Sequence, residues 1–137
     1  MDVTCLPRRV LFIDDDPIVL NTLAYLLRKA GHDVEEAESG SAGLARFREK
    51  PADIVLTDFT MTGLTGGDVA RAVKALDPRV PVVYVTGSAH DIAPHERALA
   101  EAIIEKPCGL TILHNVICAL TGDIGQSPHS EPTLASA

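Results

Sequence analysis

The chain has 137 residues, 46% of them hydrophobic and 23% charged, a composition typical of one globular domain with a substantial core. Its formal net charge of −7 argues against direct contact with nucleic acid. No apolar run approaches the ~20 residues that span a bilayer, and the first ten residues lack the apolar stretch of a signal peptide. We therefore expect a cytoplasmic protein with no membrane partner.

The cysteines agree with that location. They are three in number, which is odd, and they form no Cys-x-x-Cys pair. Because intracellular proteins keep most thiols reduced, we expect Cys5, Cys108 and Cys118 to be free thiols.

Strand-like apolar runs alternate with helix-like amphipathic segments along most of the chain. In chain order, the pattern predicts a strand at 9–13, a helix at 17–31, a strand at 33–37, a helix at 41–50 and a strand at 53–58. A helix at 66–77, a strand at 80–87, a short helix at about 91–100, a strand at 102–106 and a helix at 109–120 follow. Five such units predict the α/β class, with a doubly wound parallel sheet covered on both faces.

The ends of the chain differ in composition from this repeating part. Residues 1–8 form a short N-terminal extension in this division, and residues 9–120 form the domain. Residues 121–137 are rich in Gly, Ser and Pro, so we expect a flexible C-terminal tail.

Polar residues follow four of the five expected strands. Asp14 and Asp15 follow the first strand, Asp58 ends the third, Thr86 the fourth and Lys106 the fifth. In open parallel sheets, ligands bind outside the carboxyl ends of the strands. These five side chains are therefore the candidate functional residues.

Three consecutive aspartates need an explanation, because adjacent like charges repel. Asp16 precedes Pro17 and is expected to cap the following helix. Asp14 and Asp15 taken alone are equally well explained as solvated loop acids. Asp58 changes this balance, because three carboxylates that meet at one sheet edge favour a hard divalent cation such as Mg²⁺.

These residues together have the chemistry of a phosphoryl-transfer site. Asp58 is the candidate nucleophile, which would give an acyl phosphate. A metal held by Asp14 and Asp15 and the ammonium of Lys106 would neutralise the phosphoryl oxygens, and Thr86 would donate a hydrogen bond to one of them.

Four segments resemble, in order, the motifs of the receiver domain of two-component response regulators. They are LFIDDDPIVL, DIVLTDFTMTGLTG, PVVYVTG and EKP, and the resemblance extends over about residues 9–120. It implies a flavodoxin-like (βα)5 fold with strand order 2-1-3-4-5. It also implies a phosphoacceptor module, not an enzyme beyond self-catalysed phosphotransfer and autodephosphorylation, that switches conformation. The module would be a stand-alone regulator or part of a hybrid kinase.

The resemblance also implies a role for each site residue. Asp14 and Asp15 are the acidic pair that binds Mg²⁺ together with Asp58, and Asp58 is the phosphoacceptor. Thr86 is the switch hydroxyl and Lys106 the lysine that contacts the phosphoryl group. The implied phosphoryl donor is a sensor histidine kinase or a phosphotransfer protein.

The sequence departs from the family pattern at three positions outside these five. Thr62 stands where the family usually has proline, Ile103 where it has an aromatic residue, and Cys108 where an aromatic often follows the Lys-Pro pair. We therefore expect switching to rely on Thr86 and loop movement. Thr60 and Ser88 occupy the variable positions that tune the lifetime of the phosphoryl group in this family.

Other functions remain open on the sequence alone. A small phosphatase similar to the haloacid dehalogenase superfamily would use Asp14 as nucleophile, but it leaves Asp58 unexplained. A binding module that keeps the fold without phosphorylation is a further alternative. The apolar surface of the last helix is either a wide buried face or a homodimer or partner surface formed with the fourth helix.

Overall fold

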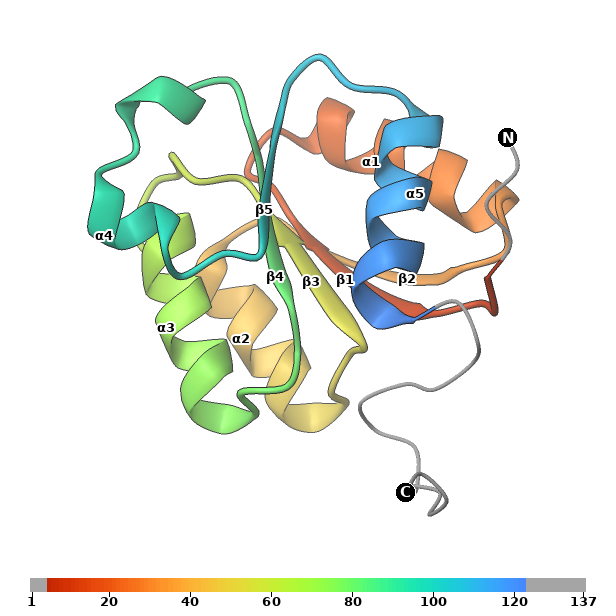
Figure 1. The fold of residues 1–137 in the computed structure, drawn as a ribbon, viewed down its shortest axis with the longest axis horizontal. Coiled ribbons are helices and arrows are strands. Elements are labelled where there is room, and N and C mark those ends of the chain that lie inside the picture. Colours follow the sequence, from red (N-terminus) through yellow and green to blue (C-terminus); the bar gives the residue numbers. More distant parts are fainter. Residues whose placement is uncertain (1–4, 123–137) are drawn as a thin grey trace.

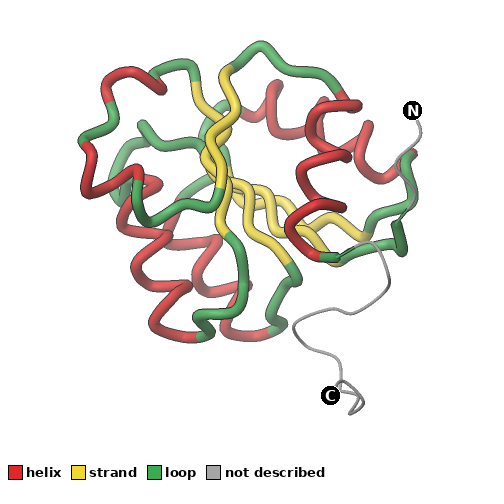
Figure 2. The backbone as a smooth tube through the Cα atoms, in the orientation of Figure 1, coloured by secondary structure: helices red, strands yellow, loops and turns green. Residues whose placement is uncertain are grey.

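Five short strands, four of them mostly apolar, form one parallel sheet in the computed structural model, which describes residues 5–122 (Figures 1 and 2). The strands are β1 (Arg9–Ile13), β2 (Asp33–Ala37), β3 (Ile54–Thr57), β4 (Val82–Thr86) and β5 (Ala102–Glu105). They lie in the order β2-β1-β3-β4-β5, which confirms the predicted flavodoxin-like topology.

Helices cover both faces of this sheet. They are α1 (Pro17–Lys29), α2 (Gly40–Glu49), α3 (Gly66–Leu76), α4 (Pro94–Arg97) and α5 (Leu110–Thr121), with a 3-10 turn at Ala89–Asp91. α1 and α5 pack on one face, and α2 and α3 pack on the other (Figure 1). The fourth helix is a single turn, shorter than the 91–100 segment predicted for it. Within residues 5–122, no helix combines the length and the hydropathy needed to cross a membrane.

Local capping explains where three helices begin. The side chain of Asp16 accepts hydrogen bonds from the backbone N–H groups of Ile18 and Val19, which confirms it as the cap of α1. Ser39 caps α2 in the same way. Thr65 and Asp68 form a reciprocal capping box at the start of α3, directly after the loop that follows β3.

The edge strand β2 carries charge on its outer positions. Glu35 pairs with Arg9 on β1 at 2.6 Å and with Arg46 on α2 at 3.5 Å, and Glu36 pairs with Arg28 on α1 at 2.7 Å. These partly exposed pairs contribute little stability each, but they place charged side chains along the β2 edge of the sheet.

The cysteine prediction was wrong for two of the three residues. Cys5 and Cys118 form a disulfide that joins positions 113 residues apart, and only Cys108 of the three is a free thiol. The spacing of the cysteines gave no sign of this bond, because only the folded topology brings Cys5 beside the end of α5. The expected tail lies outside the described residues after Gly122, and the division into extension, domain and tail stays a prediction.

The tight contact at the start of α3 gives a stability prediction. A Cβ at Gly66 would lie 2.6 Å from the backbone oxygen of Asp58 and 2.8 Å from the Cα of Phe59, so Gly66→Ala must displace backbone. We expect a loss of about 1–3 kcal/mol in unfolding free energy. Urea denaturation followed by circular dichroism measures it.

The neighbouring glycine provides the matched control. A Cβ at Gly67 would meet only the end of the flexible Glu96 side chain, which can move away. Because alanine is the better helix former by up to ~1 kcal/mol, Gly67→Ala should be neutral or stabilising. Equal losses in the two variants would contradict the backbone explanation.

Candidate functional site

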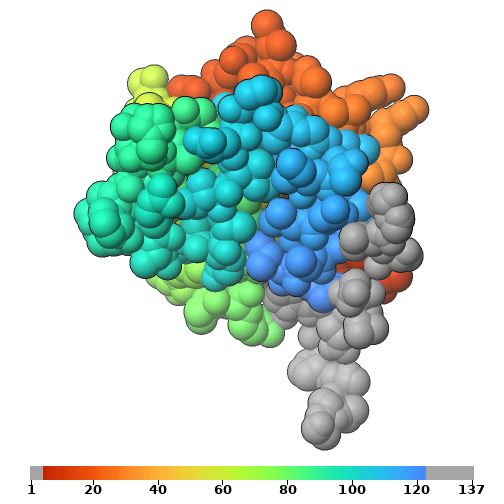
Figure 3. All heavy atoms as spheres, turned by 45° about the horizontal axis from the view of Figure 1, so that its top comes forward, coloured from red at the N-terminus to blue at the C-terminus, as the bar shows by residue number. Residues whose placement is uncertain are grey.

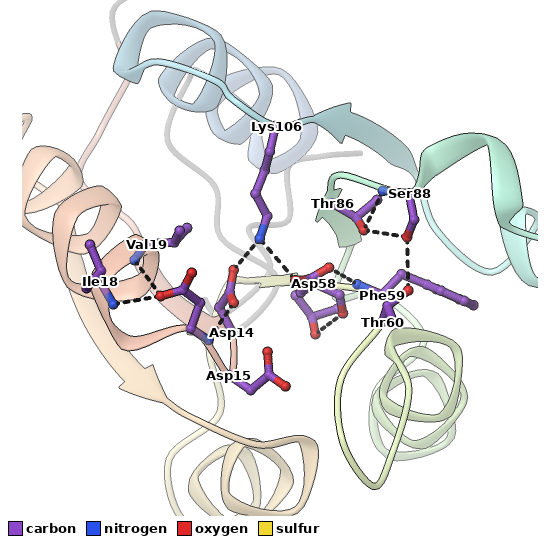
Figure 4. A network of polar contacts seen from close by, with 12 residues as sticks. Asp14, Asp15, Ile18, Val19, Asp58, Phe59, Thr60, Thr86, Ser88 and Lys106 are labelled. Atoms are coloured by element: carbon purple, nitrogen blue, oxygen red, sulfur yellow. Dashed lines mark hydrogen bonds and ion pairs between the residues drawn. The ribbon is translucent and has the colours of Figure 1, made fainter.

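The register of the two central strands brings the acidic residues together. Ile13 on β1 is paired with Thr57 on β3, so Asp14 and Asp58 follow at adjacent positions on the carboxyl edge of the sheet (Figure 4). The Asp58 N–H donates to the carbonyl of Ile13 at 2.9 Å and continues the ladder into the site. Asp14 is fully buried and Asp58 is 8% exposed.

Lys106 lies between these two carboxylates. Its Nζ donates to Asp14 Oδ2 at 2.8 Å and to Asp58 Oδ2 at 3.0 Å (Figure 4). The residue comes directly after β5, and its backbone N–H donates to the carbonyl of Thr86 at 3.0 Å. The sheet therefore fixes the lysine backbone two strands away from Asp58, and the long side chain spans the gap.

The electrostatics of this contact are balanced between burial and pairing. Burial raises the pKa of Asp14, although hydrogen bonds from Lys106 and the Asp16 N–H partly oppose the rise. Burial by itself lowers the pKa of Lys106, but its hydrogen bonds to Asp14 and Asp58 raise it overall. The lysine therefore stays charged and supplies the positive charge between the two acids.

The three acids have the donor set of a divalent cation site. Carboxylate oxygens of Asp14, Asp15 and Asp58 all lie within 4.8 Å of one another. Asp15 is exposed and lies beside Asp14 and Asp58 (Figure 4). Its Oδ2 accepts a hydrogen bond from the Thr62 N–H at 3.2 Å. An all-oxygen, partly solvent-accessible set of this kind suits Mg²⁺, which keeps several water ligands.

Thr86 reaches the same edge from β4 but points into a chain of hydroxyls. Thr86 Oγ1 lies 3.1 Å from Ser88 Oγ, and Ser88 Oγ lies 2.9 Å from Thr60 Oγ1 (Figure 4). The Ser88 N–H also donates to Thr86 Oγ1 at 3.2 Å. Ser88 and Thr60, singled out from the sequence as tuning positions, thus connect the loop after β4 to the loop after β3.

Sequence reasoning missed two residues that support this arrangement. The Phe59 N–H donates to Asp58 Oδ1 at 2.7 Å and orients that carboxylate, and its ring packs edge-to-face on Tyr84. Burial raises the pKa of Tyr84 to about 12, so its hydroxyl stays protonated and donates to the carbonyl of Glu96 in α4 at 2.8 Å. The continuous valine-rich run around Tyr84 indicated only a buried strand, and backbone donors such as the Phe59 N–H leave no compositional signal.

Comparison with known proteins identifies the class that this fold and site define. Residues 10–118 match the model of the response regulator receiver domain, so the chain belongs to that family. The response regulator receiver protein CpdR of Brucella abortus is 31% identical over 112 residues, which are 80% of this chain and 93% of CpdR. In several other curated relatives, the matched region is only 34–36% of a longer protein.

Solved structures agree with this family. A receiver domain protein from Clostridium thermocellum is 29% identical with a TM-score of 0.75, and the match covers 82% of this chain and 92% of that one. TrrA of Thermotoga maritima, solved in complex with Mg²⁺-BeF, is 24% identical with a TM-score of 0.77, covering 82% and 98%. The chain is thus a phosphoacceptor module of two-component signalling, whose partner class is the histidine kinases, and not a conventional enzyme.

The acidic set gives a prediction for metal binding. Asp15→Asn should weaken Mg²⁺ binding about tenfold or more, because it removes one of three carboxylates that face the cation. The shift of the Phe59 amide resonance during a Mg²⁺ titration measures the affinity, since that N–H donates to Asp58.

Asp16→Asn is the control, because it removes the same charge one residue away while asparagine still caps α1. Its Mg²⁺ affinity should equal that of the wild type. If both variants bind Mg²⁺ equally well, the three acids are not the metal site.

Proposed function

We propose that Asp58 is the phosphoacceptor of this receiver domain and that Asp14, Asp15, Thr86 and Lys106 serve its reaction. The observation that carries the proposal is Lys106 Nζ, which is hydrogen-bonded to Asp58 on one side and to the buried Asp14 on the other. A cation in that position would lie beside the phosphoryl oxygens of an acyl phosphate formed on Asp58 and could neutralise their charge.

The chemistry transfers a phosphoryl group from a phosphohistidine to a carboxylate. A carboxylate oxygen of Asp58 forms a bond to phosphorus while the bond from phosphorus to the histidine nitrogen breaks, and that nitrogen keeps the electron pair. The Lys106 ammonium, which contacts the Asp58 carboxylate before the reaction, would contact a phosphoryl oxygen after it. When bound by the three acids, Mg²⁺ would supply further positive charge beside the same oxygens.

Accessibility favours Asp58 over Asp14 as the nucleophile. Asp14 is fully buried, so an incoming phosphoryl group cannot reach its carboxylate. Asp58 keeps an exposed fraction of 8%. The phosphatase alternative, which needs Asp14 to attack, has no support from this geometry or from the family match.

Switching in this proposal begins at the Thr86 hydroxyl. A phosphoryl group on Asp58 offers it a charged acceptor in place of the neutral hydroxyl of Ser88. When Thr86 turns toward that acceptor, its hydrogen bond to Ser88 breaks. Ser88, which also contacts Thr60, is then less restrained, and the loop before α4 is free to shift. Ile103 replaces the usual aromatic, so the signal passes through this loop.

The donor kinase would dock beside the site, on α1 and the loop before α5. A shallow pocket of about 370 Å³ is lined there by Ile18, Val19, Thr22, Leu23, Lys106, Pro107 and Cys108. Ile18 is 75% exposed although it is apolar, and Lys106 belongs to both the pocket and the site. A protein that carries a phosphohistidine can cover Ile18 while it presents the phosphoryl group to Asp58.

The output surface would lie next to this pocket, over α5 and the segment that contains α4 (Figure 3). These parts adjoin on one face of the molecule (Figure 3), and Ile112 on α5 is 52% exposed. A downstream protein or a second copy of the chain could bind there, so a homodimer through the last two helices stays part of the proposal. A cytoplasmic location, where histidine kinases present their phosphoryl group, is part of it as well.

Intact mass spectrometry after incubation with acetyl phosphate and Mg²⁺ tests the phosphoacceptor. The wild type should gain one phosphoryl group, and Asp58→Asn should gain none because an amide cannot form the acyl phosphate. Asp16→Asn, which keeps the helix cap, should be labelled like the wild type. Labelling of Asp58→Asn at the wild-type rate would end the assignment.

Two exposed isoleucines separate docking from chemistry. Ile18→Asp should lower the rate of phosphotransfer from a histidine kinase that labels the wild type by about tenfold or more, because it places a charge in an apolar contact. Labelling by acetyl phosphate should stay unchanged, since this small donor needs no docking surface. Ile112→Asp on α5 should leave both rates unchanged, and a slow reaction with the kinase in this variant would move the docking surface to α5.

A further inference from the structure

A second group of reactive side chains lies at the opposite end of the sheet from the acids. Cys5 is bonded to Cys118 near the end of α5, with 5.6 Å between the two Cα atoms. His114, one turn earlier on α5, has its Nε2 3.6 Å from Cys118 Sγ. His32 and Arg8, which stand just before β2 and β1, complete the group. None of these residues takes part in the phosphoryl site.

We propose that Cys5 and Cys118 are a redox-active dithiol that exchanges with low-molecular-weight thiols and disulfides of the glutathione type. His114 is its positioning residue, and it holds the Cys118 sulfur through an N–H donor. This site is independent of the phosphoryl chemistry, and its oxidised form fastens the segment before β1 to the end of α5.

The hydrogen bonds around His32 determine where His114 carries its proton. The Arg8 backbone N–H donates to His32 Nδ1 at 3.0 Å, so that nitrogen is an acceptor. Burial lowers the pKa of His32 to about 4, with further lowering by the nearby His114 and Arg8, so the ring is neutral at pH 7. A neutral imidazole that accepts at Nδ1 carries its proton at Nε2.

The proton position on His32 also determines the proton position on His114. His32 Nε2 lies 3.0 Å from His114 Nδ1, and because His32 holds the proton, His114 Nδ1 is the acceptor. A neutral His114 then carries its proton at Nε2, the nitrogen that faces Cys118 Sγ. The two histidines thus point an N–H group at the sulfur, which stabilises a thiolate at Cys118 when the disulfide opens.

Exposure decides the order of the exchange reaction. Cys118 is 1% exposed, whereas Cys5 is only half-buried, so an incoming thiolate reaches Cys5. It forms a mixed disulfide with Cys5 Sγ, and the Cys118 thiolate leaves with the electron pair of the broken bond. A second small thiol then releases Cys5. Two small thiols become one small disulfide, and the protein gains two electrons and two protons.

The same cluster could be considered a metal site, because ligand atoms of Cys5, His114 and Cys118 lie within 4.8 Å of one another. A metal would need the lone pair of His114 Nε2, since that nitrogen faces the sulfur. The hydrogen bonds from Arg8 through His32 place a proton there instead. This donor pattern favours thiol chemistry over zinc binding.

Opening the disulfide should loosen the contact between the two ends of the domain. The buried Arg8 donates a hydrogen bond from its guanidinium to the carbonyl of Gly122, directly after α5. With the disulfide, this contact ties the segment of Cys5 and Arg8 to α5. Because the bond closes a loop of 113 residues, its reduction should lower the thermal midpoint by on the order of 10 °C.

The test uses the full chain carrying Cys108→Ser, which leaves only the pair. Samples are equilibrated in mixtures of reduced and oxidised glutathione, and their free thiols are alkylated and counted by intact mass spectrometry. The thermal midpoint of unfolding is measured in parallel. We expect one reversible two-electron transition and a lower midpoint for the reduced form. Failure of the bond to form or to open under native conditions would overturn the proposal, as would one tightly bound Zn²⁺ per reduced chain.

Variants of His114 test its role. His114→Leu should be reduced by glutathione about tenfold more slowly, because the leaving thiolate loses its donor. His114→Gln, whose amide keeps an N–H, should recover part of the rate, and His95→Leu, an exposed histidine of α4, should match the wild type. Equal rates in all four proteins would remove His114 from the mechanism. If His114→Leu does not fold, the glutathione titration of the Cys108→Ser chain still decides whether the pair is a redox-active dithiol.

Discussion

The structure depends on two buried carboxylates that share one ammonium group. Oxygens of Asp14 and Asp58 lie within 4.8 Å of each other, so two unit charges there would repel by at least about 3.5 kcal/mol at an effective dielectric constant of 20. Lys106 contacts both at 3.0 Å or less, so two attractions oppose one repulsion. The Lys106 ammonium also supplies positive charge beside Asp58 that could neutralise an incoming phosphoryl group. If Asp58 is the nucleophile, as we propose, the hydrogen bonds from Lys106 and the Phe59 N–H already orient its carboxylate, so little reorganisation is needed when a phosphoryl group arrives.

The strand order brings Lys106 beside Asp14 and Asp58. Because that order follows from the pattern of strands and helices, much of the site could be predicted from the sequence. Continuous apolar runs predicted five parallel strands, and polar residues at their ends marked one edge. The Asp16-Pro17 pair predicted a helix start by local chemistry alone. What could not be predicted depends on distance along the chain. The Cys5–Cys118 bond and the contact of His32 with His114 join positions 113 and 82 residues apart, and no local pattern records them.

Helix α5 links the two chemical regions of the molecule. It begins a few residues after Lys106, whose side chain reaches the acids, and it carries His114 and Cys118 toward the other end of the sheet. α5 also packs against α1, which starts beside the acidic pair. An element that is fixed at one end by Lys106 and at the other by the Cys5 bond offers a physical route by which thiol chemistry could influence a phosphorylation response without touching Asp58.

The charged edge strand has a consequence for how copies of this protein meet. An exposed strand edge is a template for adding a strand from another chain, which is the first step of aggregation. β2 counters this with Glu35 and Glu36, each paired with arginines from neighbouring elements, so an incoming backbone would have to displace ion pairs and bury their charge. Strand addition at the β2 edge is thereby discouraged. Copies of the protein that meet at this edge would contact each other through solvated charged side chains, which favours separation over aggregation.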